Sequence, residues 1–327
     1  MTDISVILCT YNRCESLEHA VESVLACAMS GSYNWELLVV DNNSKDSTGL
    51  VVEELVARYP GRIRYLFEPR QGKSNALNSG IRESAGDILA FVDDDVTVDP
   101  NWLQNLALVL QKQEWSGVGG RILPEKNFTP PAWLSLKGRY ALAPLAIFDL
   151  GVQAGETSEP PFGTNMAFRR QVFEKIGGFR TDLGPCPGSE IRSEDTEFGY
   201  RALSAGFRLW YEPSAIVYHS LNPERLRKKY FLAWWYDKSR ADIRQDGVPS
   251  GSRFVIAGVP LFLLRRLIFW SLRWMCSLQE ERRFSCKLNA WKVAGSIHEC
   301  RRQSVLGTRE TREAISDAVR STGGKGQ

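Results

Sequence analysis

The stretch ILAFVDDDV, residues 88–96, passes from an apolar run directly into three consecutive carboxylates. Ile88–Val92 has the length and composition of a buried β-strand. Asp93, Asp94 and Asp95 follow it without a spacer, and like charges this close repel one another. A bound cation, a helix N-terminus or exposure to water must offset this repulsion. Which of these applies depends on what else lies at the end of the strand.

The composition of the 327-residue chain is that of an ordinary globular protein, with 43% hydrophobic and 24% charged residues. Its length suits two average domains, or one large α/β domain with an extension. The N-terminal sequence MTDISVILCTYNR has an acidic residue and a short apolar run, unlike a signal peptide. Seven scattered cysteines without a C-x-x-C pair indicate reduced thiols. We therefore expect a cytoplasmic protein.

The net charge of +3 conceals two regions of opposite charge. Residues 1–220 carry 20 Lys and Arg against 28 Asp and Glu, whereas residues 221–310 carry 18 against 8. An acidic body followed by a basic, aromatic-rich region indicates two different tasks along the chain.

Strand and helix patterns alternate over the first 120 residues. The expected strands are Ile4–Cys9, Glu36–Val40, Ile63–Phe67 and Ile88–Val92. The expected helices span residues 17–25, 50–59, 73–84 and about 100–113. Asp99 and Pro100 supply an N-cap and a first-turn proline for the last of these helices. The alternation predicts an α/β fold, with a mostly parallel sheet and helices on both faces.

Polar residues follow three of the expected strands at the point where each strand ends. They form the runs Thr10–Arg13, Asp41–Ser44 and Asp93–Asp95. Parallel sheets bind ligands at the carboxyl ends of their strands, so these runs predict a ligand site at one edge. A dinucleotide site is disfavoured because no G-x-G-x-x-G follows the first strand. A P-loop is excluded because Phe67 stands where RQGKS (70–74) would need its first glycine.

The region after residue 120 is less regular. Residues 123–162 are rich in proline and predict a covering segment, whereas GTNMAF (163–168) predicts a further strand. Residues 180–192 form a Gly/Pro-rich loop, and we expect Ser193 to cap the helix that follows it.

Eight short motifs occur in a fixed order along residues 4–220. They are TYNR (10–13), VVDNNS (39–44), RQGKSNALNSGI (70–81), FVDDDV (91–96), GTNMAFRR (163–170), GGF (177–179), SEDTEF (193–198) and VYH (217–219). Each is weak alone, but together they resemble the family 2 glycosyltransferases of the GT-A fold. The resemblance implies a catalytic domain over 1–220, with a nucleotide-binding half at 1–120 and an acceptor half at 121–220.

The resemblance also implies a reaction. An inverting enzyme of this family moves a sugar from a nucleotide-diphosphate donor, most often a UDP-sugar, to a hydroxyl group of a glycan or lipid-linked acceptor. We expect a role in cell-surface polysaccharide biosynthesis. The leaving diphosphate needs Mg²⁺ or Mn²⁺ as a Lewis acid, and hard cations prefer carboxylate and phosphate oxygens.

The family pattern assigns roles to individual residues. FVDDDV matches a D-x-D element, in which Asp95 ligates the metal and Asp93 binds the donor or the metal. His219 is a further expected metal ligand, and the alternative is that it is an ordinary core histidine. Thr10 and Asp41 are expected to line the nucleotide pocket, and the alternative is that they only cap the loop that follows. Lys73 is expected to meet the diphosphate, and the alternative is that it is exposed to solvent. The expected donor-binding residues are Thr10, Tyr11, Arg13, Asp41, Lys73, Asp93, Asp94 and Asn165.

The pair Glu194-Asp195 matches the position of the family's catalytic base, with Asp195 as the base. Acidic residues are also favoured in the first turn of any helix, which is the alternative reading. One base without a second nucleophile predicts direct displacement with inversion.

The basic region 221–310 predicts a helical extension. Its segment 254–278 is apolar but interrupted by Arg265, Arg266 and Arg273, and the uninterrupted part, 254–264, is too short to span a bilayer. We expect an amphipathic helix in peripheral contact with anionic lipid at the cytosolic face of the membrane. Packing on the catalytic domain is the alternative, and no motif indicates nucleic-acid binding. Residues 311–327 predict a disordered tail.

Two other functions fit parts of the pattern. A GT-A-like nucleotidyltransferase would share the fold without needing an acceptor base. A non-catalytic subunit that binds glycan or nucleotide would need neither the base nor the metal ligands.

Overall fold

The computed structural model describes residues 4–30, 33–126, 128–138, 140–188, 191–248 and 254–323, with side chains in the last range to residue 305. The chain divides into two compact units. The first comprises Met1–Pro130 with Leu136–Arg227, and the second comprises Pro131–Ser135 with Lys228–Gln327.

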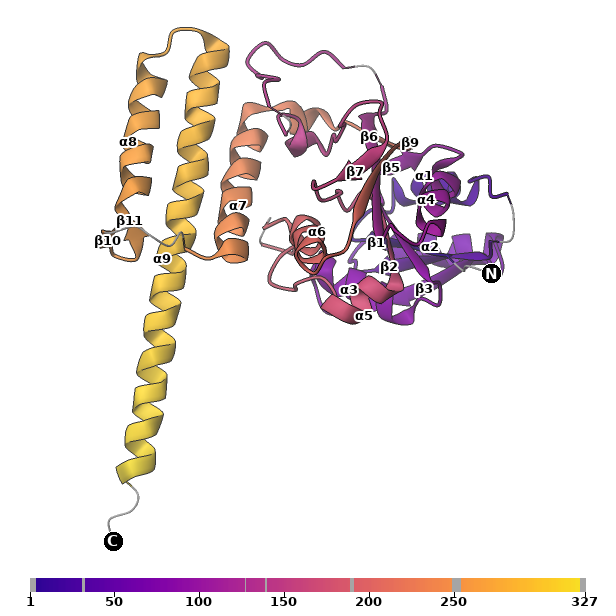
Figure 1. The fold of residues 1–327 in the computed structure, drawn as a ribbon, viewed down its shortest axis with the longest axis horizontal. Coiled ribbons are helices and arrows are strands. Elements are labelled where there is room, and N and C mark those ends of the chain that lie inside the picture. Colours follow the sequence, from indigo (N-terminus) through magenta and orange to yellow (C-terminus); the bar gives the residue numbers. More distant parts are fainter. Residues whose placement is uncertain are drawn as a thin grey trace. The chain divides into compact units, whose positions relative to one another are not determined.

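The first unit is built on a nine-stranded sheet (Figure 1). Its strands are β1 (Ile4–Thr10), β2 (Trp35–Asp41), β3 (Ile63–Phe67), β4 (Ile88–Asp93), β5 (Val96–Val98), β6 (Gly117–Pro124), β7 (Gly155–Thr157), β8 (Asn165–Arg169) and β9 (Leu209–His219). The strand order is β3-β2-β1-β4-β8-β6-β9-β5, and β7 pairs with β9. Strands β3, β2, β1 and β4 are mutually parallel.

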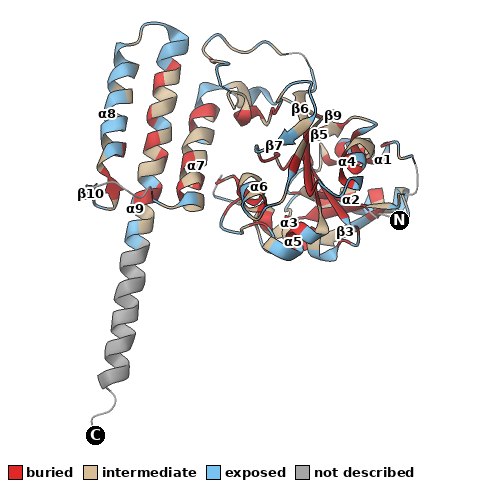
Figure 2. Ribbon diagram, viewed as in Figure 1, coloured by how far each residue is buried: buried red, intermediate tan, exposed pale blue. Residues whose placement is uncertain are grey.

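Helices cover both faces of this sheet. They are α1 (Leu17–Leu25), α2 (Thr48–Arg58), α3 (Lys73–Glu83), α4 (Trp102–Gln111), α5 (Arg170–Ile176) and α6 (Glu194–Ser204). Val6 and Leu8 of β1 pack with α1, α2 and α4, whereas Ile7 packs with α3, α5 and α6. The side chains of one strand therefore alternate between two hydrophobic cores. Figure 2 colours the central strands of the sheet as buried. The predicted α/β fold with helices on both faces is confirmed.

Several local features differ from the sequence prediction. β8 is antiparallel to both β4 and β6, which strand–helix alternation does not predict. Helix α4 begins at Trp102 with Asn101 as its N-cap, because the Asp99 carboxylate instead accepts the Asn101 N–H (2.9 Å) one turn earlier. The region 123–162 is not wholly irregular, since it holds the end of β6, a 3₁₀ turn η1 (Ala143–Leu145) and β7.

The second unit contains three long helices and a short hairpin. They are α7 (Lys228–Asp246), β10 (Val255–Ile256), β11 (Val259–Pro260), α8 (Leu261–Cys276) and α9 (Glu280–Gly323). Leu263 of α8 and Ile243 of α7 share one core with Val293 and Cys300 of α9. No helix in the described part of the chain combines the length and hydropathy that crossing a bilayer requires.

The disordered tail expected over 311–327 is corrected in part. The backbone is helical to Gly323, and residues 324–327 lie outside the described residues. The segment RETREAISDAVR (309–320) consists largely of helix-forming residues, which the sequence prediction overlooked in favour of the Gly-rich end.

At Gly120 the backbone of β6 approaches β9 and the side chain of Asn165 on β8 closely. A Cβ atom at Gly120 would lie 2.0 Å from the carbonyl oxygen of Ala215 on β9 and 2.5 Å from Nδ2 of Asn165 on β8. Asn165 Nδ2 donates to the carbonyl groups of Arg121 and Ala215, both at 2.8 Å. Only glycine at position 120 leaves room for this amide between the strands.

Gly120→Ala is therefore expected to destabilise the first unit by roughly 3 kcal/mol, because overpacking forces the backbone of β9 to shift. Gly155→Ala in β7 is the matched control, since a Cβ there meets nothing within 4 Å. The control should be neutral or slightly stabilising. Urea unfolding of the two variants tests this, and equal midpoints would contradict it.

Candidate active site

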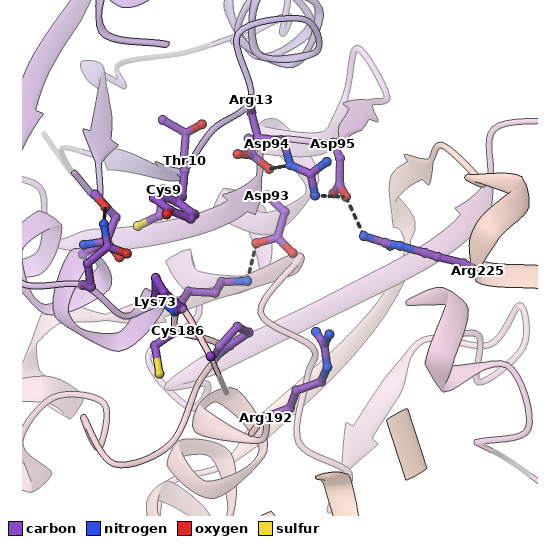
Figure 3. A pocket seen from close by; sticks show the side chains of 17 residues that line it. Cys9, Thr10, Arg13, Lys73, Asp93, Asp94, Asp95, Cys186, Arg192 and Arg225 are labelled. Carbon is purple, nitrogen blue, oxygen red and sulfur yellow. Dashed lines mark hydrogen bonds and ion pairs between the residues drawn. The ribbon is translucent and has the colours of Figure 1, made fainter. Parts of the chain in front are cut away.

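The three predicted polar runs meet at one edge of the sheet. Thr10 pairs with Asp41 across β1 and β2, and Cys9 pairs with Asp93 across β1 and β4. A pocket with a solvent-accessible volume of about 350 Å³ opens at this edge (Figure 3). The predicted residues that line it are Thr10, Tyr11, Arg13, Lys73, Asp93, Asp94 and Asp95.

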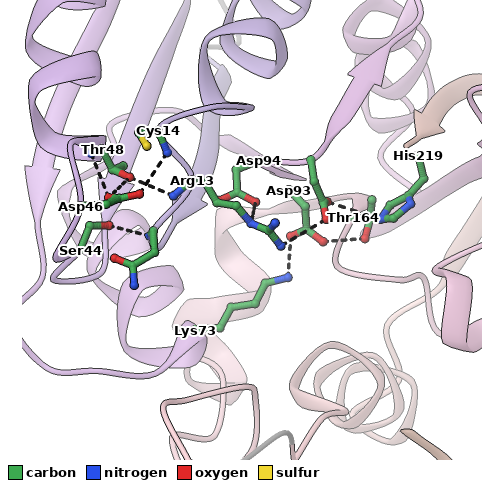
Figure 4. Close-up of polar contacts among 12 residues, drawn as sticks. Arg13, Cys14, Ser44, Asp46, Thr48, Lys73, Asp93, Asp94, Thr164 and His219 are labelled. Carbon is green, nitrogen blue, oxygen red and sulfur yellow. Dashed lines mark hydrogen bonds and ion pairs between the residues drawn. The ribbon is translucent and has the colours of Figure 1, made fainter. Parts of the chain in front are cut away.

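Cations surround the first two carboxylates of the triplet (Figure 4). Lys73 Nζ lies 2.5 Å from Asp93 Oδ1, and the hydroxyl group of Thr164 donates to Asp93 Oδ2 at 2.7 Å. Arg13 Nε lies 3.7 Å from Asp94 Oδ1. Lys73 is thus bound to Asp93 in the pocket and is not a solvated side chain. Burial alone would lower the pKa of Lys73, but the nearby Asp93 and Glu194 raise it well above its usual value.

Three groups face the carboxylate of Asp95. Arg225 Nη2 lies at 3.1 Å and Arg13 Nη2 at 3.6 Å, and Nε2 of His219 lies 3.4 Å from Oδ1. Burial would raise the pKa of Asp95, but the guanidinium groups of Arg225 and Arg13 hold it below its usual range. Asp94 lacks comparable compensation. Burial and the neighbouring Asp95 therefore raise its pKa to about 7.

The loop that carries Arg13 is fixed to the segment after β2 (Figure 4). The Arg13 N–H donates to Thr48 Oγ1 at 2.9 Å, and the Cys14 N–H donates to Asp46 at 3.3 Å. Asn12 beside them has a positive φ of 52°. These contacts hold the backbone of the loop, so Arg13 extends from a fixed position toward Asp94 and Asp95.

The pair Glu194-Asp195 begins helix α6. The Gly163 N–H donates to Asp195 Oδ2 at 2.7 Å, which joins α6 to the start of β8. Glu194 is buried, and burial together with Asp195 raises its pKa to about 7. Lys73 therefore lies in the electrostatic field of Asp93 and of the Glu194-Asp195 pair.

Ser193 occupies the N-cap position of α6, but its side chain does not cap the helix as predicted. Its φ is 91°, a left-handed conformation that costs roughly 1–3 kcal/mol in a residue with a Cβ. Its hydroxyl group is buried and has no hydrogen-bond partner among the described residues. The left-handed backbone turns the chain sharply just before Glu194.

Two predicted donor-binding residues do not line the pocket. The carboxylate of Asp41 accepts the Ser44 N–H (2.9 Å) and the hydroxyl group of Tyr65 (3.1 Å). Asn165 is fully buried; Trp102 Nε1 donates to its carbonyl oxygen (2.8 Å), and its amide donates to the backbone. Asn165 therefore joins β8, β6 and α4 and is too enclosed to bind a donor.

The pocket also contains residues that the sequence did not single out. They include Cys9, Asn42, Gln71, Cys186, Arg192 and Arg225. Asn42 follows Asp41 in a predicted motif, and its side chain accepts the Gly72 N–H at 2.8 Å. Arg225 was grouped with the basic extension, and no sequence signal distinguished it from its basic neighbours. Part of the loop predicted at 180–192, residues 189 and 190, lies outside the described residues.

The predicted metal site is only partly assembled by the protein itself. Within the described residues, no group of three or more His, Cys, Asp or Glu side chains could hold a metal ion. Asp95 and His219 lie together, whereas Asp93 is bound by Lys73 and Thr164. The buried Nδ1 of His219 has no hydrogen-bond partner in the part of the chain that the structure describes. Because Mg²⁺ and Mn²⁺ bind through one or two protein ligands plus phosphate oxygens in nucleotide sites, Asp95 and His219 fit such a cation.

Comparison with solved structures identifies the fold. A mannosyltransferase from Pyrobaculum calidifontis, solved with GDP-Man and Mn²⁺, aligns with a TM-score of 0.55 at 17% identity. The alignment covers 98% of this chain and 79% of that chain. The fold is that of the GT-A glycosyltransferases, as the sequence resemblance implied.

The sequence comparisons identify the family. The family model described as "Glycosyl transferase family 2" matches residues 5–177, and the chain belongs to this family. Glycosyltransferase AglE of Haloferax volcanii is 28% identical over 229 residues, 69% of this chain and 70% of that protein. The succinoglycan biosynthesis protein ExoM of Rhizobium meliloti is 28% identical over 232 residues, 71% of this chain and 70% of that protein.

The raised pKa of Glu194 predicts a stability that depends on pH. A carboxyl group with a raised pKa binds its proton more tightly in the folded protein, so the free energy of unfolding falls as the pH rises from about 4.5 to about 7. The loss is up to ~3 kcal/mol for this group. Glu194→Gln should remove this part of the fall, whereas the part due to Asp94 remains.

Urea unfolding of the ligand-free protein at several pH values between about 5 and about 8 measures this effect. The exposed Glu83 provides the control variant Glu83→Gln, which should follow the wild type. If the free energy of unfolding depends on pH in the same way for Glu194→Gln and the wild type, Glu194 does not have a raised pKa in the folded protein.

Proposed function

We propose that the protein is an inverting, metal-dependent glycosyltransferase that uses a nucleotide-diphosphate sugar. The observation that carries this proposal is that Lys73 binds Asp93 and also lies in the electrostatic field of the Glu194-Asp195 pair. In this proposal the acidic edge binds the donor and the metal, and the pair at the start of α6 supplies the base. A site of a nucleotidyltransferase would need no base, and a binding subunit would need neither.

Each side chain has a task in the proposed reaction. The bound Mg²⁺ or Mn²⁺, held by Asp95 and His219, would act as a Lewis acid on the leaving diphosphate. Arg13 and Lys73 add positive charge at the same edge of the pocket, where they stabilise the negative charge that develops on the phosphates. Thr10 and Tyr11 line the part of the pocket beside Asn42, where we assign the nucleoside, with a UDP-sugar as the first candidate.

Asp195 is the proposed base. Its Oδ2 accepts the Gly163 N–H and its Oδ1 accepts the Thr196 N–H at 2.6 Å, so the carboxylate is held in one orientation. It would accept the proton of the acceptor hydroxyl group as that oxygen attacks the anomeric carbon. The bond to the diphosphate breaks on the opposite side, which inverts the configuration.

The acceptor assignment is supported by the relatives. ExoM is named for succinoglycan biosynthesis, and an O-antigen chain rhamnosyltransferase of Salmonella typhimurium is 25% identical over 82% of this chain. We therefore propose a glycan or lipid-linked acceptor in cell-surface polysaccharide biosynthesis. We propose the cytosolic face of the membrane as the place of this reaction.

Asp195→Asn is expected to lower kcat by roughly 10²–10⁴-fold, because the base is lost while the size of the side chain is kept. Binding of the nucleotide with Mn²⁺ should be retained. The exposed Asp87 supplies the control, since it precedes β4 at the opposite end of that strand from the acidic triplet, and Asp87→Asn should keep full turnover. Turnover with a panel of nucleotide sugars measures the first effect and calorimetry the second. An Asp195→Asn variant with normal turnover would favour the nucleotidyltransferase alternative.

We also propose that helix α8 binds an anionic membrane surface. Its inner face, with Leu263, Leu264 and Leu267, packs on α9. Its outer face carries exposed apolar side chains beside exposed arginines: Phe262, Ile268, Phe269, Leu272, Met275, Arg265, Arg266 and Arg273. Figure 2 shows this exposed face along the helix.

The charge of this segment supports a lipid partner rather than a protein core. No acidic residue occurs between Asp246 and Glu280. The hairpin before α8 adds Phe254, Val255 and Ile256, all more than half exposed. A helix with apolar side chains and arginines on one open face lies in the interface of an anionic bilayer. At 16 residues, α8 is about 24 Å long, short of the ~30 Å hydrocarbon layer.

Ile268→Glu combined with Leu272→Glu is expected to weaken binding of the full chain to anionic vesicles by about tenfold or more. Leu50→Glu combined with Leu108→Glu adds the same charge at exposed positions of α2 and α4, and should leave binding unchanged. Co-sedimentation with phosphatidylglycerol-containing and pure phosphatidylcholine vesicles measures both. Equal partitioning of the two double variants would refute the lipid contact and favour packing within the protein.

A further inference from the structure

Arg225 enters the pocket from η2 (Pro223–Leu226), a 3₁₀ turn that follows the last sequence motif. Its Nη2 lies 3.1 Å from Asp95 Oδ2, and its Nη1 lies 3.0 Å from His219 Nε2. One guanidinium group therefore bridges the carboxylate and the imidazole assigned to the divalent cation. Figure 3 shows this side chain directed at Asp95.

The hydrogen-bonding geometry around Arg225 indicates what this bridge replaces. A guanidinium group only donates hydrogen bonds, so His219 Nε2 must accept from Arg225. Asp95 Oδ1, also an acceptor, lies 3.4 Å from the same nitrogen. Nε2 cannot donate to Asp95 while it accepts from Arg225. Two acceptor atoms that lie this close need a positive charge beside them, and Arg225 supplies it.

The two acceptors and the arginine differ in how firmly they are held. His219 is 1% exposed at the end of β9, and its neighbour in the sheet is Val96, the residue after Asp95. The turn η2 has no buried residue and is held by local bonds to Asn222. A segment with so few buried contacts moves at low cost. His219 and the residue after Asp95 are thus held in the sheet, whereas Arg225 belongs to a weakly held turn.

We propose that Arg225 occupies the cation position of the site in the ligand-free protein. When the donor nucleotide binds, Arg225 moves onto the diphosphate and leaves that position to the cation. The inference rests on the proposed nucleotide-sugar chemistry. A guanidinium group binds phosphate oxygens through two nitrogens, as it binds Asp95 and His219 here. Arg225 is a donor-binding residue that also makes cation binding and nucleotide binding depend on each other.

The charge of Arg225 determines the sign of this dependence. Without nucleotide, Arg225 competes with a divalent cation for Asp95 and His219. With nucleotide, the same positive charge attracts the diphosphate and leaves both ligands to the cation. Cation and nucleotide therefore strengthen each other's binding, and by linkage the effect is equal in both directions.

Arg225→Ala separates the two effects. Mn²⁺ binding without nucleotide should become about tenfold tighter, and binding of UDP or GDP in saturating Mn²⁺ about tenfold weaker. Isothermal titration calorimetry measures both on the full chain. Arg225→Lys keeps one charge but loses the two-nitrogen bridge, so both affinities should lie between those of the wild type and Arg225→Ala.

Arg227→Ala is the matched control. Arg227 ends the same turn, pairs with Glu224 and does not line the pocket, so its loss should change neither affinity. If Arg225→Ala leaves either affinity at the wild-type value, this inference is wrong while the proposed function stands. If the wild type binds neither Mn²⁺ nor either nucleotide, the proposed function fails and the inference fails with it.

Discussion

Charge compensation at one end of the sheet is the constraint on which the site depends. Because β2, β1 and β4 are parallel neighbours, their ends bring the acidic triplet into a single buried edge. Buried carboxylates are stable only when they are paired or protonated. Lys73 and Arg13 pair with Asp93 and Asp94, and the raised pKa of Asp94 shows that the compensation there is incomplete. This charge pattern supports the proposed binding of a diphosphate together with a divalent cation.

The antiparallel strand β8 connects the donor side of the pocket to the candidate base. It pairs with β4, and Thr164 is the residue that precedes β8, so its hydroxyl group donates to Asp93. The preceding Gly163 holds Asp195 through its N–H. Close packing at Gly120 fixes the position of β8 between β4 and β6. A structural feature of the core thus determines the spacing between the acidic edge and α6.

The sequence was sufficient for the parts of the site that depend on local pattern. Apolar runs followed by polar residues located the ends of β1, β2 and β4 and the acidic triplet, and Lys73 was found through the motif RQGKSNALNSGI (70–81). It was insufficient where a side chain acts over a long sequence separation. Arg225 contacts Asp95 130 residues away, and nothing in its basic neighbourhood marks it. Asn165 was misread because its motif resembles a donor site, whereas its amide is used between strands.

The adjacent Glu194 and Asp195 illustrate how environment divides two similar groups between two roles. Glu194 is buried and held partly protonated near neutral pH, a state in which it cannot serve well as a base. Asp195 accepts N–H groups from Gly163 and Thr196, which hold its carboxylate in one orientation. The left-handed turn at Ser193 immediately precedes both residues. These different environments support the proposal that Asp195, rather than Glu194, is the proton acceptor.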